Sequence, residues 1–349
     1  MSLYNRALRP ALFALSADQS HSLAHAALAW APPWRALSAA SGLNVSDPRL
    51  NTRFAGVDLR NPVGLAAGFD KDGELLESLS SLGFGFICIG SIMPEPRFGN
   101  PFPRLVRYGD KESLADSMGV PSKGRAYTVE RLKRRRAAGV PVFANVGGFS
   151  AETIAQGIAE VFALVDAVEI SLMCPNVLKP GEIFDEVGML RGILDRLQVP
   201  AGSLVVRVPN DTTRLHDRFA ELVEVCIKAG IGGLKVGGGS RVIEPALGSG
   251  TGTLHGRAIF ETALANVERA SQFSRGRIPI KGNGGISSAD DVLAMRRAGA
   301  VCVDLYSAFV YQGWTIVRDI NRGLLETFDR ARHDPSLLKA FAPPKTEPI

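Results

Sequence analysis

A cysteine followed by proline and asparagine, Cys174-Pro175-Asn176, stands directly after an apolar, β-branched segment near Val168–Ser171. A thiolate at the end of a strand can accept a proton from carbon. An unperturbed thiol has a pKa of about 8.5 and is mostly protonated at neutral pH, so it needs a cationic neighbour to lower that pKa. The alternative is a small buried apolar residue, which is the commoner role of a lone cysteine. The other three cysteines lie within strand or helix patterns and fit that alternative better.

Two glycine-rich segments offer backbone to a ligand. The first, 61–74, ends a strand and carries Lys71, although a tight turn explains its glycines more simply. The second, 282–286, leaves another strand, and Ser287 or Ser288 is a plausible cap of the next helix. Free N–H groups at a helix start bind phosphate, and the loops after strands 7 and 8 of a parallel barrel form a common phosphate site. This second segment therefore predicts a phosphate group, with ordinary turn glycines as the alternative.

Eight apolar segments, each followed by a helical pattern, must position these residues. The strands are expected near Val63–Leu65, Phe86–Ile89, Val142–Val146, Val168–Ser171, Leu204–Val208, Leu234–Val236, Ile278–Lys281 and Cys302–Leu305. Helices are expected over Glu74–Leu82, Gly124–Ala138, Ala151–Val165, Glu186–Leu197, Leu215–Ala229, Ala258–Ala270 and Ala289–Ala298, with one more after the last strand. This order predicts a parallel (β/α)8 TIM barrel, and an open doubly wound sheet is the alternative. Two connections, 92–123 and 237–257, are too long for plain turns and follow strand ends, where barrels build active sites.

The chain is expected to have three parts: an N-terminal helical extension over 1–42, the barrel over 43–330 and an irregular tail over 331–349. The pattern of the extension predicts two helices, Leu3–Leu15 and Asp18–Trp30. Apolar side chains and arginines lie near one another in this segment. Such a pair can lie in a membrane interface through residues 1–35, or it can pack on the barrel. His21 and His25 share one helix face, which we place away from the barrel mouth.

Composition excludes several classes of protein. The 349 residues are 46% apolar and 21% charged, which is an ordinary globular balance. No apolar run reaches the length of a membrane span, and no secretory signal is visible. Four scattered cysteines without a CxxC pair favour a reducing, cytoplasmic location, and the histidines form no metal pattern. A net charge of +5 permits an anionic ligand or membrane surface but does not demand nucleic acid, and we expect neither metal nor nucleic acid.

Taken together, these segments resemble the flavin-dependent dihydroorotate dehydrogenases, most closely the membrane-associated, quinone-using class. The resemblance runs to about residue 325 and rests on segments such as Asn61–Glu74, Ile89-Gly90-Ser91, Cys174-Pro175-Asn176, Gly282–Ile286 and Tyr306-Ser307. It implies an FMN-binding barrel with Cys174 as the base and Lys71 and Asn176 as substrate contacts. It also implies an FMN site lined by Ala67, Gly68, Ser91, Asn145, Gly256, Gly284, Gly285, Tyr306 and Ser307.

The departures from the family pattern lie around the substrate. Where relatives place amide and hydroxyl contacts, this chain has Asp116, Ser171 and Gly237, and Arg207 replaces a flavin-facing lysine. A carboxylate at 116 would repel a substrate carboxylate unless a cation intervened. Charged residues inside strands are rare unless paired, so we expect a Glu169–Arg207–Lys235–Lys281 network that also touches the cofactor through Lys235.

The sequence therefore predicts an FMN-dependent oxidoreductase of this family, acting on a CH–CH bond of a small, cyclic carbonyl compound that differs from dihydroorotate. The first alternative is a genuine dihydroorotate dehydrogenase with a quinone acceptor, peripheral on the inner face of the cell membrane. A non-catalytic flavoprotein and a flavin-free sugar-phosphate enzyme are further alternatives.

Overall fold

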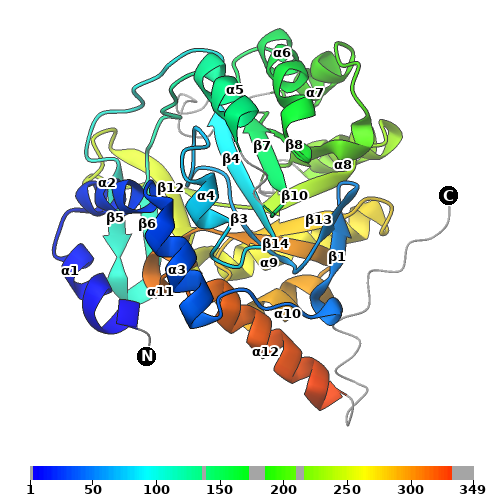
Figure 1. Cartoon of the computed structure of the whole chain (residues 1–349). Coiled ribbons are helices and arrows are strands. Elements are labelled where there is room, and N and C mark those ends of the chain that lie inside the picture. Colours follow the sequence, from blue (N-terminus) through cyan, green and yellow to red (C-terminus); the bar gives the residue numbers. More distant parts are fainter. Residues whose placement is uncertain (1–2, 136–138, 173–184, 210–215, 332–349) are drawn as a thin grey trace.

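Eight parallel strands close into a barrel in the computed structural model, which describes residues 3–135, 139–172, 185–209 and 216–331 (Figure 1). Going round the barrel from the first strand, they are β3 (Val63–Leu65), β4 (Phe86–Ile92), β7 (Val142–Val146), β8 (Ala167–Ile170), β9 (Leu204–Arg207), β10 (Gly233–Gly237), β13 (Ile280–Asn283) and β14 (Ala300–Leu305). Their order follows the chain, and β14 closes onto β3 in parallel. The predicted (β/α)8 barrel is thus confirmed.

Helices cover the outside of the barrel. They are α4 (Leu76–Leu79), α5 (Arg125–Arg134), α6 (Ala151–Val161), α7 (Glu186–Leu194), α8 (His216–Lys228), α9 (Phe260–Ser274), α10 (Ala289–Arg297), α11 (Ser307–Gln312) and α12 (Ile316–Ala331). The expected helix over Glu74–Leu82 is much shorter than predicted. The reason is that both oxygens of the Asp70 carboxylate accept backbone N–H bonds, from Glu74 at 2.8 Å and Leu75 at 2.9 Å, which hold a loop there.

The two long connections form a second sheet, which the sequence did not predict. Its strands, in the order β11-β12-β6-β5, are β11 (Ser240–Ile243), β12 (Thr251–Gly256), β6 (Ser113–Asp116) and β5 (Leu105–Tyr108). The pairing of β12 with β6 joins segments far apart in the chain, with Thr253 opposite Asp116. Such pairing leaves no local sequence signal. We call β5, β6, β11 and β12 the lid sheet.

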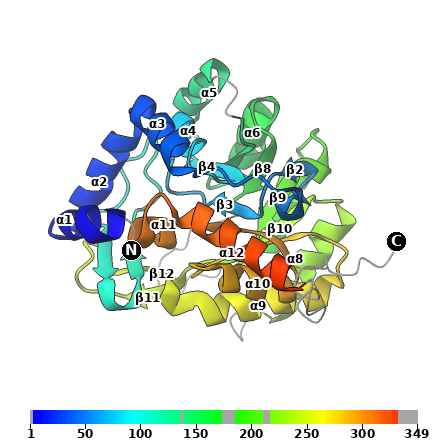
Figure 2. The ribbon, with the colours of Figure 1, turned by 60° about the horizontal axis from the view of Figure 1, so that its bottom comes forward.

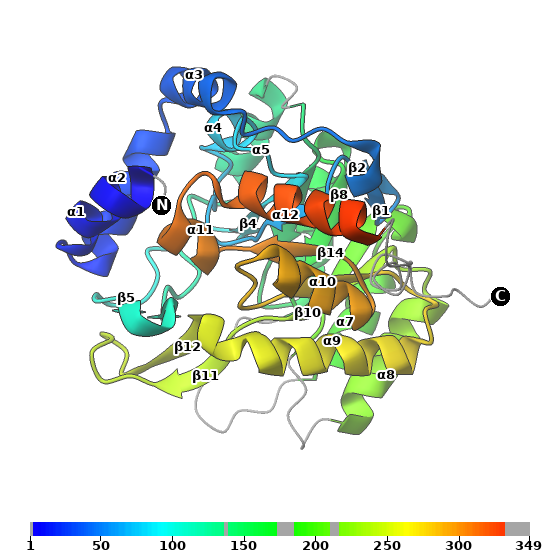
Figure 3. The same cartoon turned by 90° about the horizontal axis from the view of Figure 1, so that it is seen from below.

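The N-terminal extension packs beside the lid sheet (Figures 1 and 3). It consists of a π-helical turn (Tyr4–Leu8), α1 (Arg9–Phe13), α2 (Ala17–Leu28) and α3 (Ala31–Ser41), which was not predicted. The Asp18 carboxylate at the start of α2 accepts a bond from the backbone N–H of Arg104, at 3.1 Å, just before β5. None of the helices in the described part of the chain is long and apolar enough to span a membrane.

Aromatic rings fill the lower end of the barrel, below the charged residues described next. The hairpin of β1 (Thr52–Phe54) and β2 (Val57–Leu59) lies against this end (Figure 2). Phe86 and Phe143 stack with ring centroids 5.0 Å apart, and Phe54 stacks on Phe143 at 6.3 Å. Gly64 must lack a side chain because a Cβ there would lie 2.2 Å from the Phe86 ring. The floor of the barrel is therefore a packed plug.

Candidate active site

A cavity of about 180 Å³ lies at the mouth of the barrel, between the ends of the strands and the lid sheet. We call it the mouth cavity. The predicted site residues on its wall are Ala67, Gly68, Lys71, Ser91, Asp116, Asn145, Arg207, Lys235, Tyr306 and Ser307. The fold thus brings together residues from both ends of the sequence, and it adds Glu169, His255 and Asn283 to them.

A smaller cavity of about 40 Å³ continues from the mouth cavity and shares His255, Asn283, Tyr306 and Ser307 with it. Its wall includes the remaining predicted glycines, Gly256, Gly284 and Gly285. All three have positive φ, and a Cβ on Gly285 would lie 2.7 Å from the Phe260 side chain, so only glycine fits there. We call this the glycine cavity.

An ion pair holds the loop beside the glycine cavity. Nη1 of Arg257 lies 2.6 Å from Oδ1 of Asp291. The other carboxylate oxygen of Asp291 accepts bonds from the backbone N–H and the hydroxyl of Ser287, at 2.9 and 3.0 Å. Ser288, rather than Ser287, caps α10, since its hydroxyl accepts a bond from the N–H of Asp291 at 3.2 Å. Asp291 therefore links the loop that follows β13, through Ser287, to the segment that follows β12, through Arg257.

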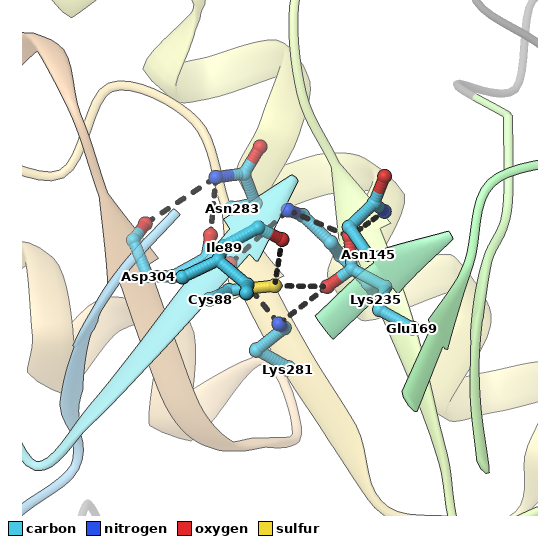
Figure 4. A network of polar contacts seen from close by, with 8 residues as sticks. All are labelled: Cys88, Ile89, Asn145, Glu169, Lys235, Lys281, Asn283 and Asp304. Carbon is cyan, nitrogen blue, oxygen red and sulfur yellow. Dashed lines mark hydrogen bonds and ion pairs between the residues drawn. The ribbon is translucent and has the colours of Figure 1, made fainter. Parts of the chain in front are cut away.

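Four buried charged residues, Glu169, Lys235, Lys281 and Asp304, form a closed ion-pair cluster below the mouth cavity (Figure 4). The Lys281 ammonium lies 2.7 Å from Glu169 and 3.1 Å from Asp304. The Lys235 ammonium lies 3.2 Å from Glu169 and 3.1 Å from Asp304. Two cations thus face two carboxylates, and the side chains of Lys281, Glu169 and Asp304 have 0% exposure.

The cluster corrects the predicted network. Asp304, which the sequence analysis did not select, completes it in place of Arg207, which lies on the cavity wall instead. Burial alone would raise the pKa of Glu169, but the positive charges of Lys235, Lys281 and Arg207 outweigh it and lower that pKa. Burial would lower the pKa of Lys281, but Glu169 and Asp304 hold it well above its ordinary value. The opposite charges around them therefore favour the ionised forms of Glu169 and Lys281.

Asn145 connects the cluster to the mouth cavity. Its amide nitrogen donates to Glu169 at 2.7 Å, which fixes the orientation of the side chain. Its oxygen is buried and has no hydrogen-bond partner among the described residues. A buried acceptor without a partner is costly, so this oxygen calls for a donor from a bound molecule.

Lys71, Asp116 and His255 meet at the opposite wall. The Lys71 ammonium donates to the carbonyl of Gly68 at 2.7 Å, and burial lowers its pKa while Asp116 opposes that shift. Nε2 of His255 lies 2.7 Å from Oδ2 of Asp116. Burial would raise the pKa of Asp116, but the contact with His255 outweighs it and the net shift is downward. The cationic neighbours that the sequence analysis required beside Asp116 are therefore Lys71 and, when protonated, His255.

Some predicted site residues lie elsewhere. Cys174 and Asn176 fall outside the described residues. Ser171 and Gly237 are buried at the ends of β8 and β10 and do not line the cavity. A Cβ on Gly237 would lie 2.0 Å from the carbonyl oxygen of Asn283, so its role in the fold is close packing between β10 and β13.

The prediction that His21 and His25 lie away from the mouth was wrong. The ring of His21 contacts that of Phe69 with centroids 6.4 Å apart, two residues before Lys71. Burial, together with the Lys71 charge, lowers the pKa of His21 to about 3, so it is neutral. It lines a third, largely apolar cavity of about 350 Å³ between α1, α2 and the barrel. Leu105, Leu114 and Tyr306 are shared between this apolar cavity and the mouth cavity.

Comparisons with known proteins agree with this architecture. The family model described as dihydroorotate dehydrogenase matches residues 49–328. A dihydroorotate dehydrogenase (quinone) of Azorhizobium caulinodans is 36% identical, with 91% of this chain and 92% of the relative covered. The one from Deinococcus deserti is 33% identical over 94% and 96%.

A solved structure extends the comparison to three dimensions. Dihydroorotate dehydrogenase from Eimeria tenella, solved in complex with ferulenol, superposes with a TM-score of 0.74 at 25% identity, covering 92% of this chain and 94% of that one. The match must include part of the N-terminal extension, because residues 43–349 alone make up a smaller share of the chain than the match covers. This chain belongs to the dihydroorotate dehydrogenase family and is an oxidoreductase acting on CH–CH bonds.

Proposed function

We propose that this protein oxidises dihydroorotate to orotate with bound FMN and passes the electrons to a quinone. The observation that carries this proposal is the likeness to proteins named dihydroorotate dehydrogenase (quinone) over more than nine-tenths of both chains. A likeness of this length takes in part of the N-terminal extension as well as the barrel. It favours the first alternative of the sequence analysis over an altered substrate.

The two connected cavities support FMN as the cofactor. The glycine cavity offers backbone at Gly256, Gly284 and Gly285 with no side chain in the way, which suits a phosphate. The mouth cavity offers the unpartnered oxygen of Asn145 to a ring N–H. FMN would supply the two-electron chemistry, while Ala67, Gly68, Ser91, Tyr306 and Ser307 would enclose it and Arg207 and Lys235 would place positive charge beside it.

The apolar cavity supports the quinone as the acceptor. Its wall carries side chains such as Leu12, Phe13 and Trp34, and it meets the mouth cavity at Tyr306. Leu3, Leu23 and Trp30 on the same extension are 68%, 52% and 68% exposed. Apolar side chains of this kind let a helix pair rest on a membrane surface where quinones dissolve. Binding to vesicles of phosphatidylglycerol, weakened by a combined Leu23→Ser and Trp30→Ser change, tests that contact.

A related substrate is the second candidate, because the polar groups of the mouth cavity are unusual. Asp116 and His255 stand on the lid sheet, and Val120 and Pro121 line the wall without an amide. A site that lacks a partner for a substrate amide loses about 1–3 kcal/mol for each one. A small cyclic carbonyl compound with fewer amide groups avoids that loss. A non-catalytic flavoprotein is less favoured, because it would give no chemical role to Lys71, Asp116 and His255 on the cavity wall.

One experiment separates these candidates. The purified protein, with its flavin spectrum recorded first, is mixed anaerobically with dihydroorotate and with a panel of other cyclic carbonyl compounds. Bleaching by dihydroorotate, and recovery of the yellow colour on adding a short-chain quinone, supports the proposal. Bleaching by another compound alone supports the second candidate, and no bleaching by any compound contradicts both. Cys174→Ala, in which the predicted base is absent, should abolish bleaching while flavin content is retained.

A further inference from the structure

The lid sheet presents a carboxylate–imidazole pair to the mouth cavity. Asp116 lies opposite Thr253 in the register of β6 and β12, and His255 is two residues further along β12. Side chains two residues apart share one face of a strand, so His255 is a diagonal neighbour of Asp116. Their side chains meet with Nε2 of His255 2.7 Å from Oδ2 of Asp116.

The pair lies at the junction of the mouth cavity and the glycine cavity, and both side chains are partly exposed to solvent. His255 lines both the mouth cavity and the glycine cavity. Its side chain is 31% exposed and that of Asp116 is 18% exposed, whereas Glu169 below the cavity has 0% exposure. Of the described groups around the mouth cavity, Lys235 and Glu169 are held in the ion-pair cluster. Imidazole is the side chain whose ordinary pKa lies near neutral pH.

We propose that His255 is a proton-transfer residue of this oxidoreductase and that Asp116 positions it. The proposal rests on the proposed function, in that a C–H bond breaks in the mouth cavity. When CH–CH becomes C=C, one hydrogen would leave with its bonding electrons, and bound FMN would be their acceptor. The other leaves as a proton, and its bonding pair becomes the π bond. After the base has taken it, that proton reaches Nδ1 of His255, while Nε2–H stays on Asp116, and passes to water.

His255 reaches solvent, whereas the groups below the cavity do not. The side chains of Lys281 and Glu169 in the ion-pair cluster have 0% exposure. The other charged or titratable groups on the walls that His255 shares are Lys71 after β3, Glu112 before β6, Arg207 of β9, Arg257 after β12 and Tyr306 after β14, besides the cluster itself. Burial raises the pKa of Tyr306 well above its ordinary value, and an arginine stays protonated, so neither exchanges protons at neutral pH.

The test compares His255→Gln, Asp116→Asn and a matched control, Glu244→Gln. Glu244 follows β11 directly, and its carboxylate accepts a hydrogen bond from the Tyr108 hydroxyl. The readout is the rate of flavin bleaching by dihydroorotate between pH 5 and 9. His255→Gln should be at least tenfold slower than the unchanged protein, and its pH profile should have a different shape. Asp116→Asn should also change the shape of the profile, with a smaller loss of rate. Glu244→Gln should behave as the unchanged protein.

Flavin content, measured in every variant, shows whether the site is intact. If His255→Gln loses flavin, His255→Ala with added imidazole replaces it, and rescue of the rate by imidazole is the expected result. An unaltered rate and pH profile in His255→Gln, or no rescue in a flavin-loaded His255→Ala, overturns the proposal.

If dihydroorotate does not bleach the unchanged protein, the proposed function fails and a second measurement decides on the pair. Long-range ¹⁵N NMR of the histidine rings should show the Nε2–H tautomer for His255 and its loss in Asp116→Asn. A tautomer that Asp116→Asn leaves unchanged contradicts the assignment.

Discussion

The ion-pair cluster inside the barrel and the mouth of the barrel both contain charged side chains, but these meet different partners. In the cluster, Lys281 and Glu169 have 0% exposure and are paired at 2.7 Å. The Lys281 ammonium also lies 5.3 Å from the centre of the Phe86 ring, on the aromatic plug. At the mouth, His255 is 31% exposed, and the buried oxygen of Asn145 has no partner among the described residues.

The difference separates charged side chains that stabilise the fold from charged side chains that can take part in chemistry with a ligand. Burying an ion costs several kcal/mol unless opposite charges and hydrogen bonds surround it, so the cluster holds a matched set of two lysines and two carboxylates. At the mouth, His255 is partly exposed and the Asn145 oxygen lacks a partner among the described residues, so a ligand can complete their contacts. Lysine and carboxylate occur in both places, so the residue type does not decide the role.

Lys281→Met should have the largest effect. The change removes one of the two cations that neutralise the buried carboxylates of Glu169 and Asp304, so that, among the described residues, only Lys235 is left to pair with them. Breaking a buried pair costs about 3–5 kcal/mol, so thermal unfolding should shift strongly downward. The control is Lys228→Met, which removes a lysine that is 76% exposed and pairs with Glu224 at 3.9 Å. Equal shifts for the two variants would mean that the cluster does not stabilise the barrel.

Acid should reduce the contribution of the same cluster. The pKa of Glu169 is lowered in the folded protein, so its stabilising effect is present above its unfolded pKa of about 4.3 and is lost as pH falls toward the folded pKa. The pKa of Lys281 is raised, so its contribution is complete at neutral pH and is lost only in strong alkali. The difference in melting temperature between the unchanged protein and Glu169→Gln should therefore shrink as pH falls below about 4. A difference that stays constant down to pH 2 contradicts this.

Gly285→Ala tests the mouth side. A Cβ at this glycine, which has φ +71°, meets the Phe260 side chain at 2.7 Å and the Gly256 carbonyl at 2.9 Å. Gly250→Ala is a matched control, since Gly250 has φ +69° and nothing within 4 Å. Both variants suffer the same strain of about 1–2 kcal/mol. Only Gly285→Ala should lose FMN, by at least tenfold in affinity, measured as flavin bound per protein during dialysis. Equal retention in both would remove the glycine cavity from the cofactor site.

Arg257→Gln should have the smallest effect. The Arg257 side chain is 46% exposed, and exposed ion pairs contribute at most about 1 kcal/mol, so thermal stability should barely change. Flavin retention should fall two- to threefold because Arg257 lines the glycine cavity. Arg277→Gln, which breaks a comparable surface pair with Glu224 away from the cavity, should leave flavin retention unchanged. A large loss of stability in Arg257→Gln would place this arginine with the structural charges instead.

Much of the barrel could be predicted from local patterns. The strand at Val142–Val146 has the predicted bounds. A short apolar run between two helical patterns is typical of a strand that is buried on both faces in a parallel barrel. The helix over Glu74–Leu82 was predicted too long, since the carboxylate of Asp70 competes for its first N–H groups. The third N-terminal helix, Ala31–Ser41, was missed because its two prolines look like a break, although proline suits the first turn of a helix.

Some residues of the site could be predicted from local sequence, and others could not. Lys71, Asn145 and the glycines could be found from motifs because each is defined by neighbours in the chain. His255 carried no such signal, since its partner Asp116 reaches it only through the pairing of β6 with β12. Asp304 was likewise missed, because its partners stand on β10 and β13 and not beside it in sequence.

The sequence by itself therefore determined the barrel, the family and the set of residues that can meet a flavin, because periodicity and motifs are local properties. Only the tertiary structure decided which charges are paired. The free energy of a buried ion depends on atoms a few ångströms away in space, and strands distant in the chain supply them. For that reason Lys281 stabilises the barrel, whereas His255 is left facing the cavity.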